Sequence, residues 1–197
     1  MIRQVRRLLW LAVGAAAIAG GALIAFRPTP LPPATSQLAD FGGPFTLTAS
    51  DGKPFASTSL AGRPYAIFFG FTHCPDVCPT TLARLARLRK AVSKGDQAFA
   101  IVFVSVDPER DSPADMGRYT GLFGTPVIGL TGSPAAIDAV KKQFGIFSKK
   151  VSQPGGDYSV DHTATVLLFD RAGRFTSTIA TDEGDGPALD KLKELTS

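Results

Sequence analysis

The only two cysteines of this 197-residue chain lie close together in the sequence, at Cys74 and Cys78. They follow the apolar run Tyr65 to Phe69, and each is followed directly by a proline. If Cys74 opens a helix after a buried strand, Cys78 lies one turn later on the same face, with a Cα separation of about 6 Å. Two cysteines at that separation can form a disulfide or provide two thiolate ligands to a metal. The prolines and the strand-to-helix turn favour such a site over two buried core cysteines.

Histidine supplies the candidate third ligand. The chain has two histidines, His73 and His162. His73 is adjacent to Cys74 and points differently from it if strand alternation continues, so we expect a surface residue that raises the thiolate character of the cysteine rather than a ligand. His162 lies in the segment YSVDHTAT, which we expect to enter the last core strand. There it either makes hydrogen bonds at a strand end or joins the two thiolates.

Two thiolates and one imidazole form a soft set of three ligands. Such a set suits copper as Cu(I), and as Cu(II) if a weak fourth ligand is added. Zinc also accepts two cysteines and one histidine, and it would keep its fourth position open. The residue types alone leave copper and zinc as alternatives.

An acidic segment runs from Asp107 to Asp111, with Glu109 between them. Its carboxylates could orient a ligand or contact a partner. The simpler interpretation is a turn at Asp107 and the proline after it, and a helix N-cap at Asp111 or Ser112 with a proline at the first helical position. We expect this structural role because capping chemistry alone explains the residue types.

Hydrophobic patterns predict the strands and helices that position these residues. A short N-terminal hairpin is expected at 45–56 around an Asp-Gly turn. Apolar runs predict strands at 65–71, 98–106, 127–130 and 165–169, the last followed by a turn at 170–173 and a partner strand at 175–179. Helical spacing predicts helices from the cysteines to about 92, from 113 to about 123, from 134 to about 144 and from 187 to 195. The first of these helices is amphipathic, with leucines on one face and basic residues between them, among them Arg84 and Arg89.

This order of elements predicts an α/β fold of the thioredoxin-like type, with helices on both faces of the sheet and an N-terminal β-hairpin extension. Ligands of such sheets collect beyond the carboxyl ends of the strands, where Cys74 lies. A thioredoxin-like domain usually has a cis-proline facing its redox cysteines at about the position of His162. No proline occurs between Pro154 and Pro187, so His162 and Thr163 occupy that place.

The N-terminal segment Leu8 to Phe26 is 19 residues long and carries no charge. This length is typical of a transmembrane helix, with cleavage as a signal peptide as the alternative. Basic residues that flank a span stay on the cytoplasmic side. Three arginines precede the segment and one follows it, at Arg3, Arg6, Arg7 and Arg27. We therefore expect a single-pass protein of a bacterial inner membrane, with its N-terminus in the cytoplasm and its domain in the periplasm.

The chain then has three predicted parts: a membrane anchor at 1–27, a proline-rich linker at 28–38 and a thioredoxin-like domain at 39–197. The formal net charge of +4 comes from the four arginines around the anchor, because the other basic residues are as numerous as the 17 acidic ones. A neutral domain argues against a nucleic-acid partner. In an oxidising periplasm, a pair of free thiols tends to become a disulfide unless it is reduced or binds metal.

Three separated segments of the chain closely resemble the signature segments of Sco/SenC proteins, in the same order. They are FGFTHCPDVCP at 69–79, VSVDPERD at 104–111 and VDHT at 160–163, and the resemblance covers roughly residues 39–195. It implies a membrane-anchored, thioredoxin-like copper protein with Cys74, Cys78 and His162 as the copper ligands. It also implies two partners, an upstream periplasmic copper donor and the subunit that carries the binuclear copper centre of cytochrome c oxidase. One departure is the segment LLFDR at 167–171, where the family often has a tyrosine and a proline.

Two functions compete on these grounds. The leading hypothesis is a metallochaperone, which breaks no substrate bond and is therefore not an enzyme: it holds copper at Cys74, Cys78 and His162 and passes it on by ligand exchange. The alternative is a thiol–disulfide reductase with a redox-active Cys74–Cys78 pair, in which Cys74 attacks and the cysteines of the copper-receiving subunit are kept reduced. The three-residue cysteine spacing and the missing cis-proline count against a general oxidoreductase. A peroxidase is weaker still, because the Thr-x-x-Cys arrangement expected there is absent.

Overall fold

The structure is a computed structural model that describes residues 3–4, 6, 10–11, 41–92 and 95–197. The chain divides into two units, Met1–Ser36 and Gln37–Ser197, and the second contains the fold described below. The predicted anchor at 1–27 lies outside the described residues except for a few positions, and the predicted linker at 28–38 lies outside them entirely. Among the described residues, no helix has the length and apolar character needed to span a membrane.

A seven-stranded sheet forms the centre of the second unit, in the order β2-β1-β5-β4-β3-β8-β9. The three middle strands β5, β4 and β3 are parallel, whereas β1 and β8 join them antiparallel. Every residue of β3 and β4 is buried, as expected for strands covered on both faces. The strands are β1 (Thr46–Ala49), β2 (Pro54–Ala56), β3 (Tyr65–Gly70), β4 (Ala100–Ser105), β5 (Ile128–Thr131), β8 (Val166–Phe169) and β9 (Phe175–Ile179).

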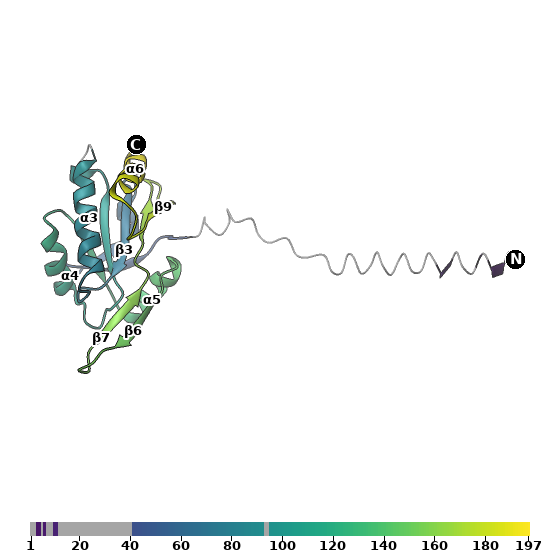
Figure 1. Cartoon of the computed structure of the whole chain (residues 1–197), viewed down its shortest axis with the longest axis horizontal. Helices are drawn as coiled ribbons and strands as arrows, with labels where there is room; N and C mark the ends of the chain where they lie inside the picture. Colours follow the sequence, from purple (N-terminus) through teal and green to yellow (C-terminus); the bar gives the residue numbers. More distant parts are fainter. Residues whose placement is uncertain (1–2, 5, 7–9, 12–40, 93–94) are drawn as a thin grey trace. The chain divides into compact units, whose positions relative to one another are not determined.

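Helices cover both faces of this sheet, as predicted. The chain moves from β3 to β4 to β5 in one direction, so right-handed crossovers place α3 and α4 on the same face. Tyr119 of α4 packs on Phe103 of β4 there, and the return to β8 places Phe144, at the end of α5, against Phe69 on the opposite face. The helices are α3 (Val77–Ala91), α4 (Pro113–Thr120), α5 (Pro134–Gln143) and α6 (Asp185–Thr196), and α6 lies beside α3 (Figure 1).

The predicted N-terminal hairpin is confirmed in β1 and β2, which pair antiparallel. Its turn contains the expected Asp-Gly pair. The Asp51 carboxylate accepts a hydrogen bond from the Lys53 amide at 3.0 Å, and Gly52 has a φ of 80°. That φ favours glycine because other residues meet a Cβ clash there. β1 also pairs with β5, so the hairpin extends the main sheet at one edge.

The helix that follows the cysteines begins at Val77, not at Cys74 as predicted, and Asp76 is its N-cap. The reason is Pro75, because a residue before proline is pushed out of the helical region. Cys74 therefore lies in the loop, where its amide donates to the Phe71 carbonyl at 3.3 Å. The two cysteines come together through this loop rather than as neighbours along one helix face.

A second hairpin was not predicted. Strands β6 (Ser148–Ser152) and β7 (Tyr158–His162) form a separate two-stranded antiparallel sheet, which projects beyond the end of the main sheet in Figure 1. The sequence SKKVS lacks the apolar alternation that marks a strand, because most of its residues are exposed. His162 consequently ends β7, instead of entering the last core strand.

Arg89 differs from the prediction of a solvated basic face on α3, because its side chain is completely buried. It donates to the Phe99 carbonyl at 3.2 Å and to the Pro126 carbonyl at 2.8 Å, and it also bonds to the Thr125 hydroxyl. These partners belong to loops at the end of the sheet away from the cysteines. Arg89 thus ties the end of α3 to those loops, which explains why a charge is tolerated in the core.

Candidate metal centre

The two cysteines meet where β3 ends and α3 begins. Cys78 is the second residue of α3 and is fully buried, whereas Cys74 in the preceding loop is partly exposed. The Cys78 amide donates to the Cys74 sulfur at 3.4 Å, and both thiols are free. The helix N-terminus thus directs an amide at the sulfur, an arrangement that favours a thiolate.

His162 reaches the cysteines from the end of β7. Its Nε2 atom lies 3.6 Å from the Cys78 sulfur, although 84 positions separate the two residues. Its Nδ1 atom lies 3.0 Å from the Thr163 carbonyl, which can only accept a hydrogen bond, so Nδ1 carries a proton and Nε2 is the nitrogen that faces the cysteines. This is the arrangement that orients a metal-binding imidazole.

The structure therefore brings together the three residues that the sequence analysis selected. One candidate ligand atom from each of Cys74, Cys78 and His162 lies within 4.8 Å of the others. Within the described residues, no other cysteine, histidine or carboxylate joins this group. The aromatic rings of Phe68 and Phe71 flank the imidazole, with centroids 6.1 and 5.9 Å away, and form an apolar wall around it.

Gly70 leaves the space that the buried cysteine occupies. A Cβ atom at this position would lie 2.6 Å from the Cys78 sulfur and 2.9 Å from Cε2 of Phe103. Both distances are well below van der Waals contact. The glycine at the end of β3 is thus required by close approach of the Cys78 side chain, and not by an unusual backbone conformation.

The two sulfur atoms have different protonation behaviour. A hydrogen bond from the Cys78 thiol, assisted by His162 and by backbone amides, lowers the pKa of Cys74 to about 4 although partial burial opposes this. The pKa of Cys78 is raised, because its thiol donates to Cys74 and because it is buried. At neutral pH without metal, the pair is therefore a thiolate at Cys74 and a thiol at Cys78.

Asp111 does not cap α4, contrary to one of the predicted alternatives. Its carboxylate is completely buried and turns back toward the cysteine loop. It accepts the Thr72 amide at 3.1 Å, the Thr72 hydroxyl at 2.6 Å and the Ser105 hydroxyl at 2.6 Å. Ser112 is the N-cap of α4, in a capping box with Asp115. Asp111 instead fixes the loop that carries Cys74.

Asp107 is also completely buried, and it faces the histidine hairpin. It accepts a hydrogen bond from Nε of Arg110 at 2.5 Å and another from the Tyr158 hydroxyl at 2.9 Å. Glu109 points outward and forms an exposed ion pair with Lys150 of β6 at 2.5 Å. The acidic segment thus has a larger role than the predicted turn and cap, because it contacts both segments that carry candidate ligands.

His73 lies outside the group of candidate ligands. Its side chain is 53% exposed, with Nδ1 3.1 Å from the Thr72 hydroxyl and 3.7 Å from Asp111. The causes that lower the pKa of Cys74 are Cys78, His162 and backbone amides, and His73 is not among them. His73 is therefore a surface residue, but the predicted effect on the thiolate comes from other groups.

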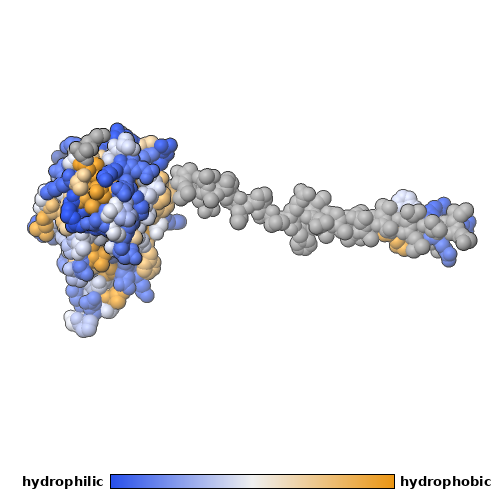
Figure 2. Space-filling model, turned by 45° about the horizontal axis from the view of Figure 1, so that its top comes forward, coloured by the Kyte–Doolittle hydropathy of each residue, from blue (hydrophilic) through white to orange (hydrophobic). Residues whose placement is uncertain are grey.

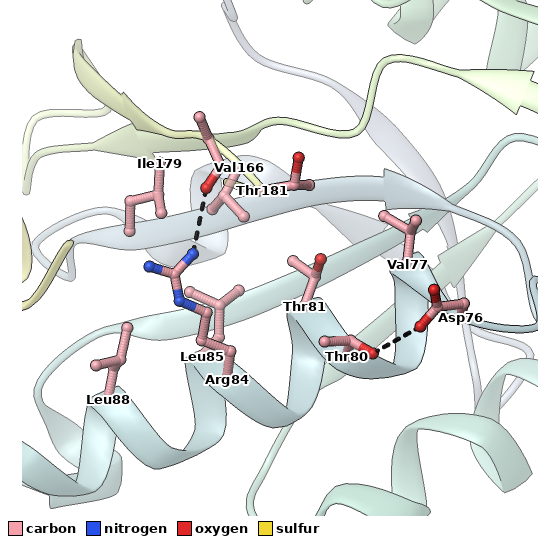
Figure 3. A pocket seen from close by; sticks show the side chains of 11 residues that line it. Asp76, Val77, Thr80, Thr81, Arg84, Leu85, Leu88, Val166, Ile179 and Thr181 are labelled. Carbon is pink, nitrogen blue, oxygen red and sulfur yellow. Dashed lines mark hydrogen bonds between the residues drawn. The ribbon is translucent and has the colours of Figure 1, made fainter. Parts of the chain in front are cut away.

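A groove of about 170 Å³ adjoins the cysteine loop, between α3 and the strands β8 and β9. Figure 3 shows Val77, Leu85 and Leu88 along the helix side, with Val166 and Ile179 opposite them. Arg84 closes one side by donating to the Ala180 carbonyl at 3.2 Å. In Figure 2 the visible face of the second unit is mainly hydrophilic, with separate apolar patches.

The donor set fits a soft metal ion. Two sulfur atoms and one imidazole nitrogen within 4.8 Å of one another suit Cu(I), and zinc accepts the same three donors. The same two sulfur atoms can form a disulfide after a small movement, because only three residues separate them and the loop before α3 carries one of them. The site therefore has the chemistry for ion transfer and for thiol–disulfide exchange.

Comparison with known proteins gives a consistent result. The SCO1/SenC family matches residues 33–197 of the chain. The SCO1 homolog 1 of Arabidopsis thaliana, a mitochondrial protein, is 39% identical over 131 residues, which are 66% of this chain and 39% of that protein. A SCO2-like protein of Rickettsia prowazekii is 33% identical over 136 residues, 68% of this chain and 66% of that protein. The chain thus spans roughly half the length of the curated relatives that it matches.

Solved structures of similar proteins share the fold. Copper-bound ScoI of Bradyrhizobium japonicum is 44% identical, with a TM-score of 0.71 over 79% of this chain and 99% of that chain. Copper-bound yeast Sco1 is 32% identical, with a TM-score of 0.71 over 79% of this chain and 87% of that chain. BsSco, described as a Sco-family cytochrome c oxidase assembly protein with a disulfide switch, is 25% identical, with a TM-score of 0.62 over 80% of this chain and 94% of that chain.

Proposed function

This chain belongs to the SCO1/SenC family, and from that premise we propose that it is a metallochaperone that carries copper for the assembly of cytochrome c oxidase. The observation that supports the proposal is the position of Cys74, Cys78 and His162, whose donor atoms lie within 4.8 Å of one another. Similar proteins have been solved with copper bound. The bound ion is cargo, which a recipient removes by replacing these ligands one at a time.

Each of the three residues has a distinct role in this proposal. Cys74, already a thiolate before metal arrives, makes the first bond to an incoming ion. Cys78 then loses its proton to complete the two-sulfur site, since a metal ligand must be deprotonated. The Nε2 lone pair of His162 supplies the third bond from outside the cysteine loop. Copper is softer than zinc, so two thiolates favour Cu(I) among the available ions.

A copper titration tests this ligand set. We expect the reduced full chain to bind one Cu(I) ion in competition with a chelator, and C78S to lose tight binding. The H162A variant should bind at least 10- to 100-fold more weakly, the range typical of losing even an indirect contact to a metal ligand. H73A is the matched control, because it removes an exposed histidine next to Cys74 and should retain full affinity. Full affinity in C78S would exclude the proposed site.

The proposed location is the periplasmic side of a bacterial inner membrane, with residues 1–27 as a single-pass anchor and 28–38 as a linker. Support comes from the uncharged stretch of 19 residues and from the three arginines that precede it. Alkaline phosphatase fused after Ser197 should be active, because that enzyme requires an oxidising compartment. A stable but inactive fusion would reverse the orientation.

The proposed partners are a periplasmic copper donor and the oxidase subunit that receives copper. A second candidate function, reduction of that subunit's disulfide, is favoured by the thiolate and thiol pair at Cys74 and Cys78. In that reaction Cys74 attacks the disulfide, Cys78 resolves the mixed disulfide, and the two electrons pass to the subunit, whose sulfurs leave as thiols. His162 separates the two functions, because only copper binding requires its lone pair.

H162A in cells therefore decides between them. We expect this variant to cycle between dithiol and disulfide in vitro, because exchange needs only the two sulfurs. We also expect it to fail in oxidase assembly at limiting copper. Normal oxidase activity, with H162A at wild-type abundance, would make copper ligation dispensable and favour the reductase.

A further inference from the structure

The hairpin that carries His162 depends on side-chain contacts for its position. Within residues 41–92 and 95–197, its two strands pair only with each other and form no backbone ladder with the main sheet. A two-stranded hairpin of this kind is marginally stable by itself. The contacts that attach β6 and β7 to the rest of the domain therefore determine where the imidazole lies.

One face of β7 makes the contacts that lie closest to the candidate ligands. Tyr158, Val160 and His162 alternate along the strand and so point to the same side. Val160 is buried in the middle of this face, with 5% of its surface exposed. His162 is at one end of the face, beside the cysteines, and Tyr158 is at the other end. A movement of Tyr158 relative to the domain would therefore tilt or shift His162.

Tyr158 is held by an arginine and a buried carboxylate. The Arg110 guanidinium carbon lies 3.7 Å from the centre of the Tyr158 ring, and Nη1 of Arg110 donates to the Tyr158 carbonyl at 3.0 Å. The Tyr158 hydroxyl and Nε of Arg110 both donate to the completely buried Asp107 carboxylate, at 2.9 and 2.5 Å. The side chain of Arg110 is only 18% exposed, so these charged contacts are largely shielded from solvent.

The same short segment also fixes the cysteine loop. The Asp107 amide donates to the Ser105 hydroxyl at 2.9 Å, and that hydroxyl donates to Asp111 at 2.6 Å. Asp111 in turn accepts two hydrogen bonds from Thr72, two residues before Cys74. Residues 105–111 thus contact both halves of the site, through Asp111 on the cysteine side and Asp107 on the histidine side.

We infer that Asp107, Arg110 and Tyr158, here called the hairpin anchor, are positioning residues that hold the imidazole of His162 at the distance that copper binding requires. None of the three belongs to the group of candidate ligands. The expected effect on copper affinity rests on the proposed function. The expected effect on the position of the hairpin is independent of whether the chain binds copper. The hairpin anchor therefore affects copper affinity only through the position of His162.

A double-mutant cycle on the full chain tests this. R110M removes the ion pairs with Asp107 and Asp157 and the hydrogen bonds, and it leaves a shorter, unbranched apolar side chain. We expect R110M to weaken Cu(I) binding about 10-fold, at the lower end of the range for residues that orient a metal ligand. Y158F, which loses one hydrogen bond and keeps the ring under Arg110, should show a smaller loss. In an H162A background, R110M should cause no further loss, because its effect passes through the imidazole.

The control is R174M. Arg174 pairs with Asp170 at 2.8 Å at the β8–β9 turn, so this variant removes an arginine–aspartate ion pair, more exposed than that of Arg110, from a hairpin without a candidate ligand. Copper affinity should remain unchanged in R174M. Equal losses for R110M in the wild-type and H162A backgrounds would overturn the inference and indicate a general structural role.

A measurement without metal separates this inference from the proposed function. Hydrogen exchange of the β7 backbone amides in the reduced, metal-free chain should be about tenfold faster in R110M, while the β3 and β4 amides keep wild-type rates. Unchanged β7 exchange would overturn the inference even if copper affinity fell. If the wild-type chain binds copper with no contribution from His162, the proposed ligand set fails, and the exchange experiment still determines whether the anchor holds the hairpin.

Discussion

The two segments that carry the candidate ligands are built in different ways. The cysteine loop connects the fully buried strand β3 to α3, and its Thr72 donates two hydrogen bonds to the completely buried Asp111 carboxylate. The histidine hairpin lies outside the main sheet and is mostly exposed along β6. Its attachment includes a cluster of side chains around Arg110.

The position of the two sulfurs and the position of the imidazole therefore depend on different parts of the fold. The two sulfurs are fixed by the core, so their spacing should change only when the domain itself is destabilised. The imidazole is held at the periphery, where local opening is less costly than global unfolding. We therefore expect changes near the cysteines to reduce the stability of the whole domain, and changes in the hairpin to alter the site with little effect on stability.

The largest expected effect is that of D111A. This variant leaves the Thr72 amide and the Thr72 and Ser105 hydroxyls without their acceptor. Each buried unsatisfied donor costs about 1–3 kcal/mol, so the free energy of unfolding should fall by about 3 kcal/mol or more. Urea denaturation of the reduced chain measures this. The control is D161A, which changes an exposed residue of the hairpin next to His162. A wild-type urea midpoint in D111A would contradict the expectation that the cysteine loop stabilises the whole domain.

A somewhat smaller loss is expected for G70A. The added Cβ would lie 2.6 Å from the Cys78 sulfur and 2.9 Å from Phe103, so the end of β3 and the start of α3 must separate. Overpacking of this kind typically costs about 1–3 kcal/mol. G186A is the control, since nothing lies within 4 Å of a Cβ added there. Equal unfolding midpoints for the two variants would show that the cysteine loop is less rigid than proposed.

The pH dependence of the cysteine pair is the next test. The pKa of Cys74 is lowered to about 4 in the folded, reduced chain, so the folded state favours the thiolate. The stability that this contributes is fully present above the unfolded pKa of about 8.5 and is lost as the pH falls through about 4. The stability difference between wild type and C74S should therefore grow between pH 4 and pH 8.5. A constant difference across that range would contradict the assignment of the thiolate to Cys74.

The smallest effect is expected for K150A on the hairpin. Lys150 and Glu109 form an ion pair at 2.5 Å, but their side chains are 45% and 60% exposed. Solvent screens such a pair, so the unfolding midpoint should not change measurably. Lys150 also lies 4.6 Å from the centre of the Tyr158 ring, next to the hairpin anchor. A clear loss of global stability in K150A would show that the hairpin and the core unfold together.

The sequence was most informative where a residue's role depends on near neighbours. Apolar runs predict the central strands, and helical spacing predicts the start of α5 at Pro134, where the structure has it. The candidate ligands were also visible, because cysteines and histidines are rare in this chain. The predicted start of α3 at Cys74 is too early, because Pro75 keeps the residue before it out of the helical region.

Roles that depend on distant partners could not be predicted. Asp111 and Thr72 are 39 positions apart, and the capping pattern around Ser112 offered a simpler explanation for the carboxylate. Arg89 follows Leu85 by four residues, so its spacing places it on the buried face of α3, but its charge predicts exposure; the loops around Phe99 and Pro126 supply the partners that make its burial possible. The β6–β7 hairpin lacks an apolar signal along β6, where most residues are exposed, and polar contacts around Tyr158 help to attach it.

The unequal exposure of the two sulfurs affects the order of events during transfer. Cys78 has no exposed surface, whereas Cys74 is partly exposed, so a partner's thiolate would reach an ion bound here from the Cys74 side and not from the Cys78 side. In the proposed copper transfer, arrival and departure would then use the same exposed side of the site. We expect donor and recipient to bind in turn rather than together in one complex of three proteins.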